Sequence, residues 1–267
     1  MIKVFIIALL IFLICFLSYF NFRQEKFSNK SRIFIPKVIY KSGKEEKDNL
    51  SPEITDLFNR IKKNNPDIEI EYYSDKDCEE FLKKNFNKQV NSAYKKLKPG
   101  SFKADLFRYC ILYKNGGIWS DLTDDFLVPI EDIINFKKDT FVLARDNNWE
   151  GYDGIQIGFM ASVPNNPIYL KAINKVVYNV ENNIYGKTVL DVTGPKVFYD
   201  VLNKDNKHII DKIKIVFDGN GPTGCYIDKN TQNKIIKYKS LKDINKILKR
   251  NNSQHYPSMW QKKDIYN

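Results

Sequence analysis

The stretch Ser101–Ile130 constrains the fold of this chain more than any other part of its sequence. Apolar and aromatic residues recur at helical spacing over Asp105–Tyr113, which predicts a helix. Asn115–Gly117 ends that helix, because asparagine and glycine tolerate a positive φ. Ile118–Trp119 then begins a short buried strand that runs into the acidic segment Asp121–Asp125. Carboxylates at a strand end suit the binding of a divalent cation better than they suit a core.

Strands and helices alternate on either side of this stretch. The patterns predict strands at 33–40, 68–73, 141–144, 155–161 and 213–217, and helices at 51–64, from 74 or 75 onward, from 166 onward and from about 192 onward. This order predicts an α/β domain with a parallel sheet and right-handed crossovers.

Bulk composition limits the possible partners. The 267 residues are 43% hydrophobic, enough for one large domain or two small ones with a real core. A net charge of +11 favours anionic partners such as nucleotide sugars or acidic membranes. We expect no nucleic-acid partner, because no binding motif and no basic block interleaved with aromatics is present. The four cysteines include no CxxC pair and no metal-type spacing.

The N-terminus carries an apolar run, Val4–Phe20, close to the lower length limit of about 17 residues for a membrane-spanning helix. A cleaved signal peptide is the alternative, but no small-x-small cleavage site follows, which favours an uncleaved anchor. We therefore predict a membrane anchor at 1–22, a polar linker at 23–32 and one folded domain at 33–267. The basic residues of the linker outnumber Lys3, so the positive-inside rule favours a cytoplasmic domain.

The acidic segment has a predicted geometry. If it is extended, Asp121, Thr123 and Asp125 share one face, and Leu122 and Asp124 share the other. An acidic turn in solvent is the alternative, although the buried strand that precedes the acids favours a metal site. Ligand sites form at the carboxyl ends of parallel strands. A Mg²⁺ or Mn²⁺ ion held there could neutralise a departing diphosphate as a Lewis acid.

The central block resembles the signature of the DXD-containing glycosyltransferases of family 32. The matching pieces are Ala104–Tyr109, Asn115–Trp119, Asp121–Thr123 and Val128–Ile130. This family includes initiating α-1,6-mannosyltransferases and capsular polysaccharide and viral sugar transferases. Flanking pieces follow in the family's order: Ile35–Tyr40, Asn65–Tyr72, Thr193–Pro195, and His255 with Ser258 and Trp260.

The resemblance implies a fold, an activity and a location. The fold is GT-A, a Rossmann-like nucleotide-sugar-binding fold with a mixed, mainly parallel sheet. The activity is transfer of a hexose from a nucleotide sugar to a hydroxyl of a glycan or of a protein- or lipid-linked sugar, with a divalent metal and with retention of configuration. The location is a membrane, with a single N-terminal anchor, in the Golgi, the ER or a host membrane if the source is eukaryotic or viral. The resemblance implies a lumenal domain, whereas the positive-inside rule favours a cytoplasmic one, so the orientation of the chain in the membrane stays open.

The resemblance also assigns residues. Catalytic roles fall on Asp105, Arg108 and Asp121. Donor binding involves the same three residues together with Tyr40, Gly116, Gly117 and Trp260. Metal ligands are Asp121, Thr123, Asp125 and His255.

The chain departs from the family pattern at the second acid of Asp-x-Asp, which is Thr123. Asp125 could replace it from the same face, or Asp124 could do so after a bulge. This departure motivates an alternative function, a catalytically inactive relative that binds nucleotide or glycan. A simple membrane-tethered interaction protein is a third possibility, but it leaves the helix, turn and acid block unexplained.

Overall fold

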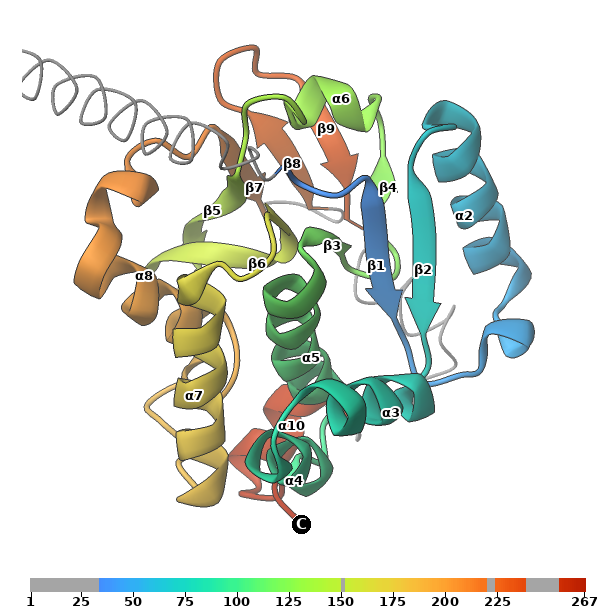
Figure 1. Cartoon of the computed structure of the whole chain (residues 1–267). Helices are drawn as coiled ribbons and strands as arrows, with labels where there is room; N and C mark the ends of the chain where they lie inside the picture. The colour runs from blue at the N-terminus through green and yellow to red at the C-terminus, as the bar shows by residue number, and fades with distance from the viewer. Residues whose placement is uncertain (1–33, 150–151, 220–223, 239–254) are drawn as a thin grey trace, which may run out of the picture. The chain divides into compact units, whose positions relative to one another are not determined.

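The computed structural model describes residues 34–149, 152–219, 224–238 and 255–267. The predicted anchor and linker at 1–22 and 23–32 lie outside these residues. Within them, no helix is long and apolar enough to cross a membrane. The described part of the chain forms one nine-stranded sheet covered by helices, in the order β2-β1-β3-β6-β5-β7-β8-β9-β4 (Figure 1).

The sheet is mixed, as predicted, but it is not mainly parallel. Its strands are β1 Val38–Ser42, β2 Glu69–Tyr73, β3 Gly117–Ser120, β4 Asp125–Phe126, β5 Phe141–Trp149, β6 Tyr152–Ser162, β7 Ile215–Asp218, β8 Cys225–Asp228 and β9 Lys234–Lys237. Strand β1 runs parallel to β2 and β3, and β5 runs parallel to β7. The other pairings are antiparallel and outnumber these. The reason is that β5 and β6, and likewise β7, β8 and β9, follow each other without a crossover helix.

The longer helices begin largely where the sequence predicts. The helices are α2 Pro52–Asn64, α3 Asp75–Asn85, α4 Lys88–Lys96, α5 Gly100–Asn115, α6 Ile130–Ile133, α7 Pro167–Glu181, α8 Pro195–Ile210 and α10 Tyr256–Gln261, with 3-10 turns η1 Lys47–Asn49 and η2 Val189–Asp191. Ser74 caps α3 in a reciprocal capping box with Asp77, and Asn166 caps α7. Ser51 precedes α2 as expected, but its hydroxyl makes no capping hydrogen bond.

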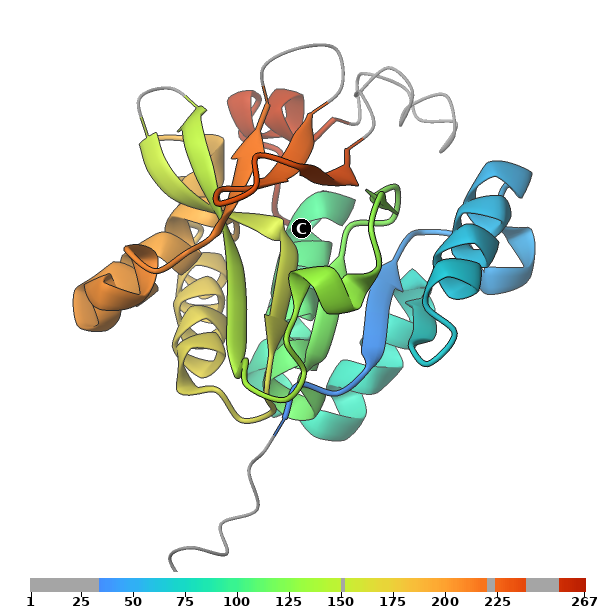
Figure 2. The ribbon, with the colours of Figure 1, turned by 90° about the horizontal axis from the view of Figure 1, so that it is seen from above.

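Two hydrophobic cores lie on the two faces of the sheet. Helices α3, α4, α5, α7 and α8 contribute to one core, which the sheet meets through residues such as Trp119. Helices α2 and α6 contribute to the other core, which the sheet meets through residues such as Ile118. Neighbouring strand residues point to opposite faces, so α2 and α5 cover opposite sides. From above, β1 and α2 (blue) lie to the right and the β5–β6 hairpin (yellow-green) to the left (Figure 2).

The junction between α5 and β3 explains the two glycines. Gly116 and Gly117 have φ values of 68° and 92°, a region that side chains disfavour. A Cβ on Gly116 would lie 2.6 Å from the backbone nitrogen of Pro164, and one on Gly117 would lie 2.7 Å from the ring of Tyr40. The glycines therefore let α5 pass directly into β3, which places the acidic segment after the other end of β3, at Ser120.

Candidate functional site

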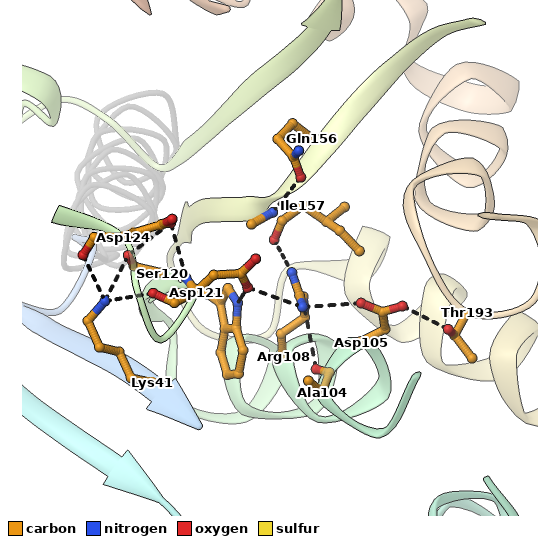
Figure 3. Close-up of polar contacts among 12 residues, drawn as sticks. Lys41, Ala104, Asp105, Arg108, Ser120, Asp121, Asp124, Gln156, Ile157 and Thr193 are labelled. Carbon is orange, nitrogen blue, oxygen red and sulfur yellow. Dashed lines mark hydrogen bonds and ion pairs between the residues drawn. The ribbon is translucent and has the colours of Figure 1, made fainter. Parts of the chain in front are cut away.

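The centre of the candidate site is the guanidinium group of Arg108 (Figure 3). Its Nη2 lies 3.1 Å from Asp105 Oδ1 and 3.3 Å from Asp121 Oδ1, and its Nη1 donates to the carbonyl of Ile157 at 2.5 Å. Asp105 and Arg108 stand three residues apart on α5 and therefore share a face. The structure thus brings together the three residues that the sequence assigned to catalysis.

Further contacts fix the two carboxylates. The indole nitrogen of Trp119 donates to Asp121 Oδ1 at 3.1 Å, and the Arg108 guanidinium lies 4.9 Å from the centre of the Trp119 ring system. Thr193, from the predicted Thr-Gly-Pro segment, donates its hydroxyl to Asp105 Oδ2 at 2.8 Å. Asp121 Oδ2 makes no hydrogen bond to any described residue, and the Asp121 side chain is 33% exposed. Described side chains therefore hold one oxygen of Asp121 and make no hydrogen bond to the other.

Burial governs the charges of this cluster. Burial raises the pKa of Asp105 to about 6, although Arg108 and the Thr193 hydrogen bond oppose the shift. Burial alone would lower the pKa of Arg108, but the carboxylates of Asp121 and Asp105 outweigh it and raise that pKa. Arg108 therefore stays charged and holds both acids.

The predicted geometry of the acidic segment is wrong. Strand β3 ends at Ser120, and the amide of Asp124 donates to the carbonyl of Asp121 at 3.0 Å, which closes a turn. A turn breaks the period-two alternation of a strand, so Asp121, Thr123 and Asp125 do not share a face. Thr123 is only 3% exposed, and Asp125 begins β4.

Asp125 also has a different partner from the one expected. Its carboxylate forms an ion pair with Arg60 of α2 at 2.9 Å. Asp124 is fully buried, and its Oδ2 accepts hydrogen bonds from the hydroxyl of Ser120 at 3.3 Å and the amide of Asp121 at 3.2 Å. The structure therefore does not bring Asp125 to Asp121, and it gives Asp124 the task of holding the turn.

Lys41 is a buried residue of this region that the sequence analysis missed. Its ammonium group donates to the carbonyl of Asp121 at 2.8 Å, the hydroxyl of Ser120 at 3.2 Å and the carbonyl of Asp124 at 3.4 Å (Figure 3). Burial lowers the pKa of Lys41 to about 8 and raises that of Asp124 well above its ordinary value. The available signal was a lysine inside the apolar strand Val38–Ser42.

Three predicted donor-binding residues lie elsewhere. Gly116 and Gly117 are at the start of β3, whereas the carboxylates follow its end. The ring of Tyr40 is buried against Gly117 and Tyr73 in the helical core. These contacts give Tyr40 and the glycines structural roles, and the structure does not bring them to Asp121.

The C-terminal helix α10 carries Trp260, and His255 directly precedes it, so both predicted site residues lie in one short segment. The indole nitrogen of Trp260 donates to the carbonyl of Tyr185 at 2.7 Å, within the helical layer. His255 precedes α10, and its ring centre lies 4.9 Å from that of Tyr256. Burial, and then the charges of Asp105 and Asp121, raise the pKa of Tyr256 to about 12. Tyr256, which the sequence analysis did not name, is thus a residue of α10 whose pKa these carboxylates affect.

The residues around Asp121 could bind a metal ion only together with other ligands. Among the described residues, no group of three histidine, cysteine, aspartate or glutamate side chains is arranged to hold a metal ion. Mg²⁺ in enzymes often uses one or two carboxylates together with substrate phosphates. The open Oδ2 of Asp121 fits a metal ion that is shared with a diphosphate, rather than one held by the protein alone.

Comparison with known proteins gives a consistent picture. Residues 51–140 match the family described as "Glycosyltransferase sugar-binding region containing DXD motif". An uncharacterized glycosyltransferase of Acanthamoeba polyphaga mimivirus is 25% identical over 198 residues, which cover 73% of this chain and 76% of that protein. The initiation-specific α-1,6-mannosyltransferase of Candida albicans is 29% identical over 105 residues, 39% of this chain and 26% of that protein. The solved structure "PaToxG Glycosyltransferase" is 18% identical with a TM-score of 0.48, covering 86% of this chain and 87% of that one.

The class of protein is therefore an enzyme that transfers sugars. The predicted resemblance is confirmed over residues 51–140, which match the sugar-binding region of the DXD-containing glycosyltransferases, and the chain is a glycosyltransferase. The matched region includes both the Asp105–Arg108 pair and the acidic turn at Asp121.

Proposed function

We propose that this glycosyltransferase moves a hexose from a nucleotide-sugar donor to an acceptor hydroxyl, with Mn²⁺ or Mg²⁺ and with retention of the anomeric configuration. A GT-A type fold is part of the same proposal. Asp105 and Arg108 contact the donor sugar, and the open oxygen of Asp121 binds the ribose or the metal. When bound, the metal would stabilise the charge of the departing diphosphate.

The observation that carries the proposal is the convergence of Asp105, Arg108 and Asp121. Two hydrogen-bond donors hold Asp121 Oδ1, which fixes the direction in which Oδ2 points. Such preorganised groups stabilise a transition state without reorganising during the reaction. We assign no nucleophile, which is consistent with a front-face displacement.

The acceptor and the location belong to the same proposal. The proposed acceptor is a glycan or a protein- or lipid-linked sugar, as the resemblance to sugar transferases implies. The apolar run Val4–Phe20 is proposed as a single membrane anchor.

Donor hydrolysis tests the proposal. The purified protein is incubated with a panel of nucleotide sugars and Mn²⁺, and release of the nucleoside diphosphate is measured. We expect turnover of at least one donor and its loss in Asp121→Asn, with Asp125→Asn as a control of equal charge change. A folded wild-type protein that hydrolyses no donor would contradict the proposal.

A second candidate function has its own observation. Thr123 is buried and Asp125 is paired with Arg60, so neither supplies the second acid that relatives use. A protein of this kind could bind a nucleotide sugar without reacting. Calorimetric binding of a donor in the absence of turnover would select this alternative.

A further inference from the structure

Tyr226 is a buried residue near the site for which the roles assigned so far give no reason. It lies on β8, far from the motif in sequence, and its ring packs 5.0 Å from that of Phe217 and 6.0 Å from that of Phe159. The side chain is fully buried, and its hydroxyl has no hydrogen-bond partner among the described residues. A buried hydroxyl without a partner costs free energy, so its presence calls for a reason.

The hydroxyl lies beside the open oxygen of Asp121. A Cβ added to Gly158 would lie 2.5 Å from the Tyr226 hydroxyl and 2.9 Å from Asp121 Oδ2. Both oxygens therefore pack against the same side of Gly158, which is possible because residue 158 has no side chain. The amide of Asp121 also donates to the carbonyl of Gly158 at 2.9 Å, which keeps the acidic turn against β6.

The described side chains that donate hydrogen bonds to Asp121 all bind one of its two carboxylate oxygens. Arg108 and Trp119 both bind Oδ1. Tyr226 is the described side chain whose unused hydroxyl borders the space beside Oδ2. A tyrosine hydroxyl carries a proton at neutral pH and can donate it in a hydrogen bond to a carboxylate.

We propose that Tyr226 is a positioning residue for the donor site: in the donor-bound enzyme its hydroxyl donates a hydrogen bond to Asp121 Oδ2 and holds that oxygen toward the ligand. The inference rests on the proposed function, because it concerns the same carboxylate. It adds a residue of the C-terminal part of the chain to a site built from α5 and β3.

Two matched variants test the inference. Tyr226→Phe keeps the ring and removes the hydroxyl. Tyr169→Phe makes the same change at another fully buried tyrosine whose hydroxyl also lacks a partner among the described residues, but which packs against Tyr109 and Phe198 in the helical core. Donor affinity is measured by calorimetry with Mn²⁺, turnover by diphosphate release, and stability by urea unfolding.

We expect Tyr226→Phe to raise the Kd for the donor and lower kcat/KM by about tenfold, which corresponds to about 1.4 kcal/mol. Tyr169→Phe should change neither quantity, and neither variant should lose stability. Equal donor affinity and turnover in Tyr226→Phe and the wild type would overturn the inference alone. If the wild type binds nucleotide sugars without turnover, the proposed sugar transfer is refuted. The role of Tyr226 is then decided by the Kd for the nucleotide sugar alone. If the wild type binds no donor, both proposals fall.

Discussion

Replacing Lys41 with methionine should destabilise the folded domain, because the Lys41 ammonium group holds the acidic turn from inside. The group is fully buried and donates to the carbonyls of Asp121 and Asp124 and to the hydroxyl of Ser120. That hydroxyl donates in turn to the carboxylate of Asp124. Methionine keeps the length and the apolar stem of lysine, but it donates no hydrogen bond and carries no charge.

The size of the effect follows from what is left unpaired. Breaking a buried charge pair by removing one partner costs about 3–5 kcal/mol, because the other charge stays buried. Lys41 and Asp124 are linked through Ser120, so the Asp124 carboxylate would lose the positive charge nearest to it. Since a domain is stable by only about 5–15 kcal/mol, Lys41→Met should remove a large part of the total.

Urea unfolding of Lys41→Met, followed by circular dichroism, measures this loss. Lys37→Met is the matched control, because Lys37 pairs with Glu131 at 2.7 Å where the two side chains are 38% and 62% exposed. Exposed pairs contribute little to stability, so we expect the control to unfold near the wild-type midpoint. Adding Asp124→Asn to Lys41→Met should recover part of the loss. The reasoning is refuted if Lys41→Met and Lys37→Met unfold at the same urea concentration.

Three further predictions follow from the site. Asp124→Ala should lower the free energy of unfolding by about 2 kcal/mol or more, because buried hydrogen-bond donors lose their acceptor. Asp125→Ala should lower it by less than about 1 kcal/mol, since only a partly exposed ion pair is lost. Equal losses in urea unfolding would contradict the turn geometry. The folded-state pKa of Asp105, about 6, lies above its unfolded value of about 3.9. As pH rises, the Asp105 carboxyl therefore loses its proton at a lower pH in the unfolded state than in the folded state. The contribution of protonated Asp105 to stability is fully present below pH 4 and is lost between about pH 4 and 6. Urea unfolding at several pH values should show this decline in the wild type and a weaker one in Asp105→Asn, and identical profiles would reject it. Gly158→Ala should lower donor turnover at least about tenfold, because the new Cβ collides with Asp121 Oδ2. Gly100→Ala, where a Cβ meets nothing within 4 Å, should retain wild-type turnover. Unchanged turnover in both variants would count against the close packing at residue 158.

The parts of the fold that the sequence predicts correctly have local causes. The capping residues Ser74 and Asn166 mark the starts of α3 and α7, where the structure confirms them. The convergence of Asp105, Arg108 and Asp121 could also be predicted from the sequence. Two of these residues share a helical face, and two glycines carry the chain from the helix directly into a strand whose end presents the third.

The errors have tertiary causes. The segment after Ser120 has a strand-like alternation, but hydrogen bonds between Asp121 and Asp124 close a turn there. Lys41 on β1 and the carbonyl of Gly158 on β6 hold this turn from distant parts of the chain. Nothing within five residues reveals these partners. The antiparallel pairing of β4 with β9 likewise joins distant parts of the chain and places Asp125 away from the site.

The C-terminal residues of the site could not be predicted for a similar reason. Tyr226 and Tyr256 stand in segments whose local pattern is that of an ordinary strand and an ordinary short helix. Their relation to Asp121 arises only when β8 joins the sheet and α10 packs against α5. The C-terminal His…Ser-Trp resemblance names this segment but not Tyr256, whose pKa reflects the charges of Asp105 and Asp121.

The charge balance is compatible with the proposed metal-dependent reaction at a site that has Thr123 in the second acidic position. Among the described residues, Asp105, Asp121 and Asp124 interact with two cationic groups, Arg108 and Lys41. All of these residues except Asp121 are buried. Arg108 pairs with Oδ1 of Asp121, and no described residue donates a hydrogen bond to Oδ2. One open carboxylate oxygen is a poor cage for a free cation, but it is sufficient for a cation that arrives with the phosphates of its donor. In the proposed reaction, the absence of a second acid would therefore place metal binding on the protein–donor complex rather than on the protein alone. The orientation of Asp121 would then be what the surrounding residues have to preserve.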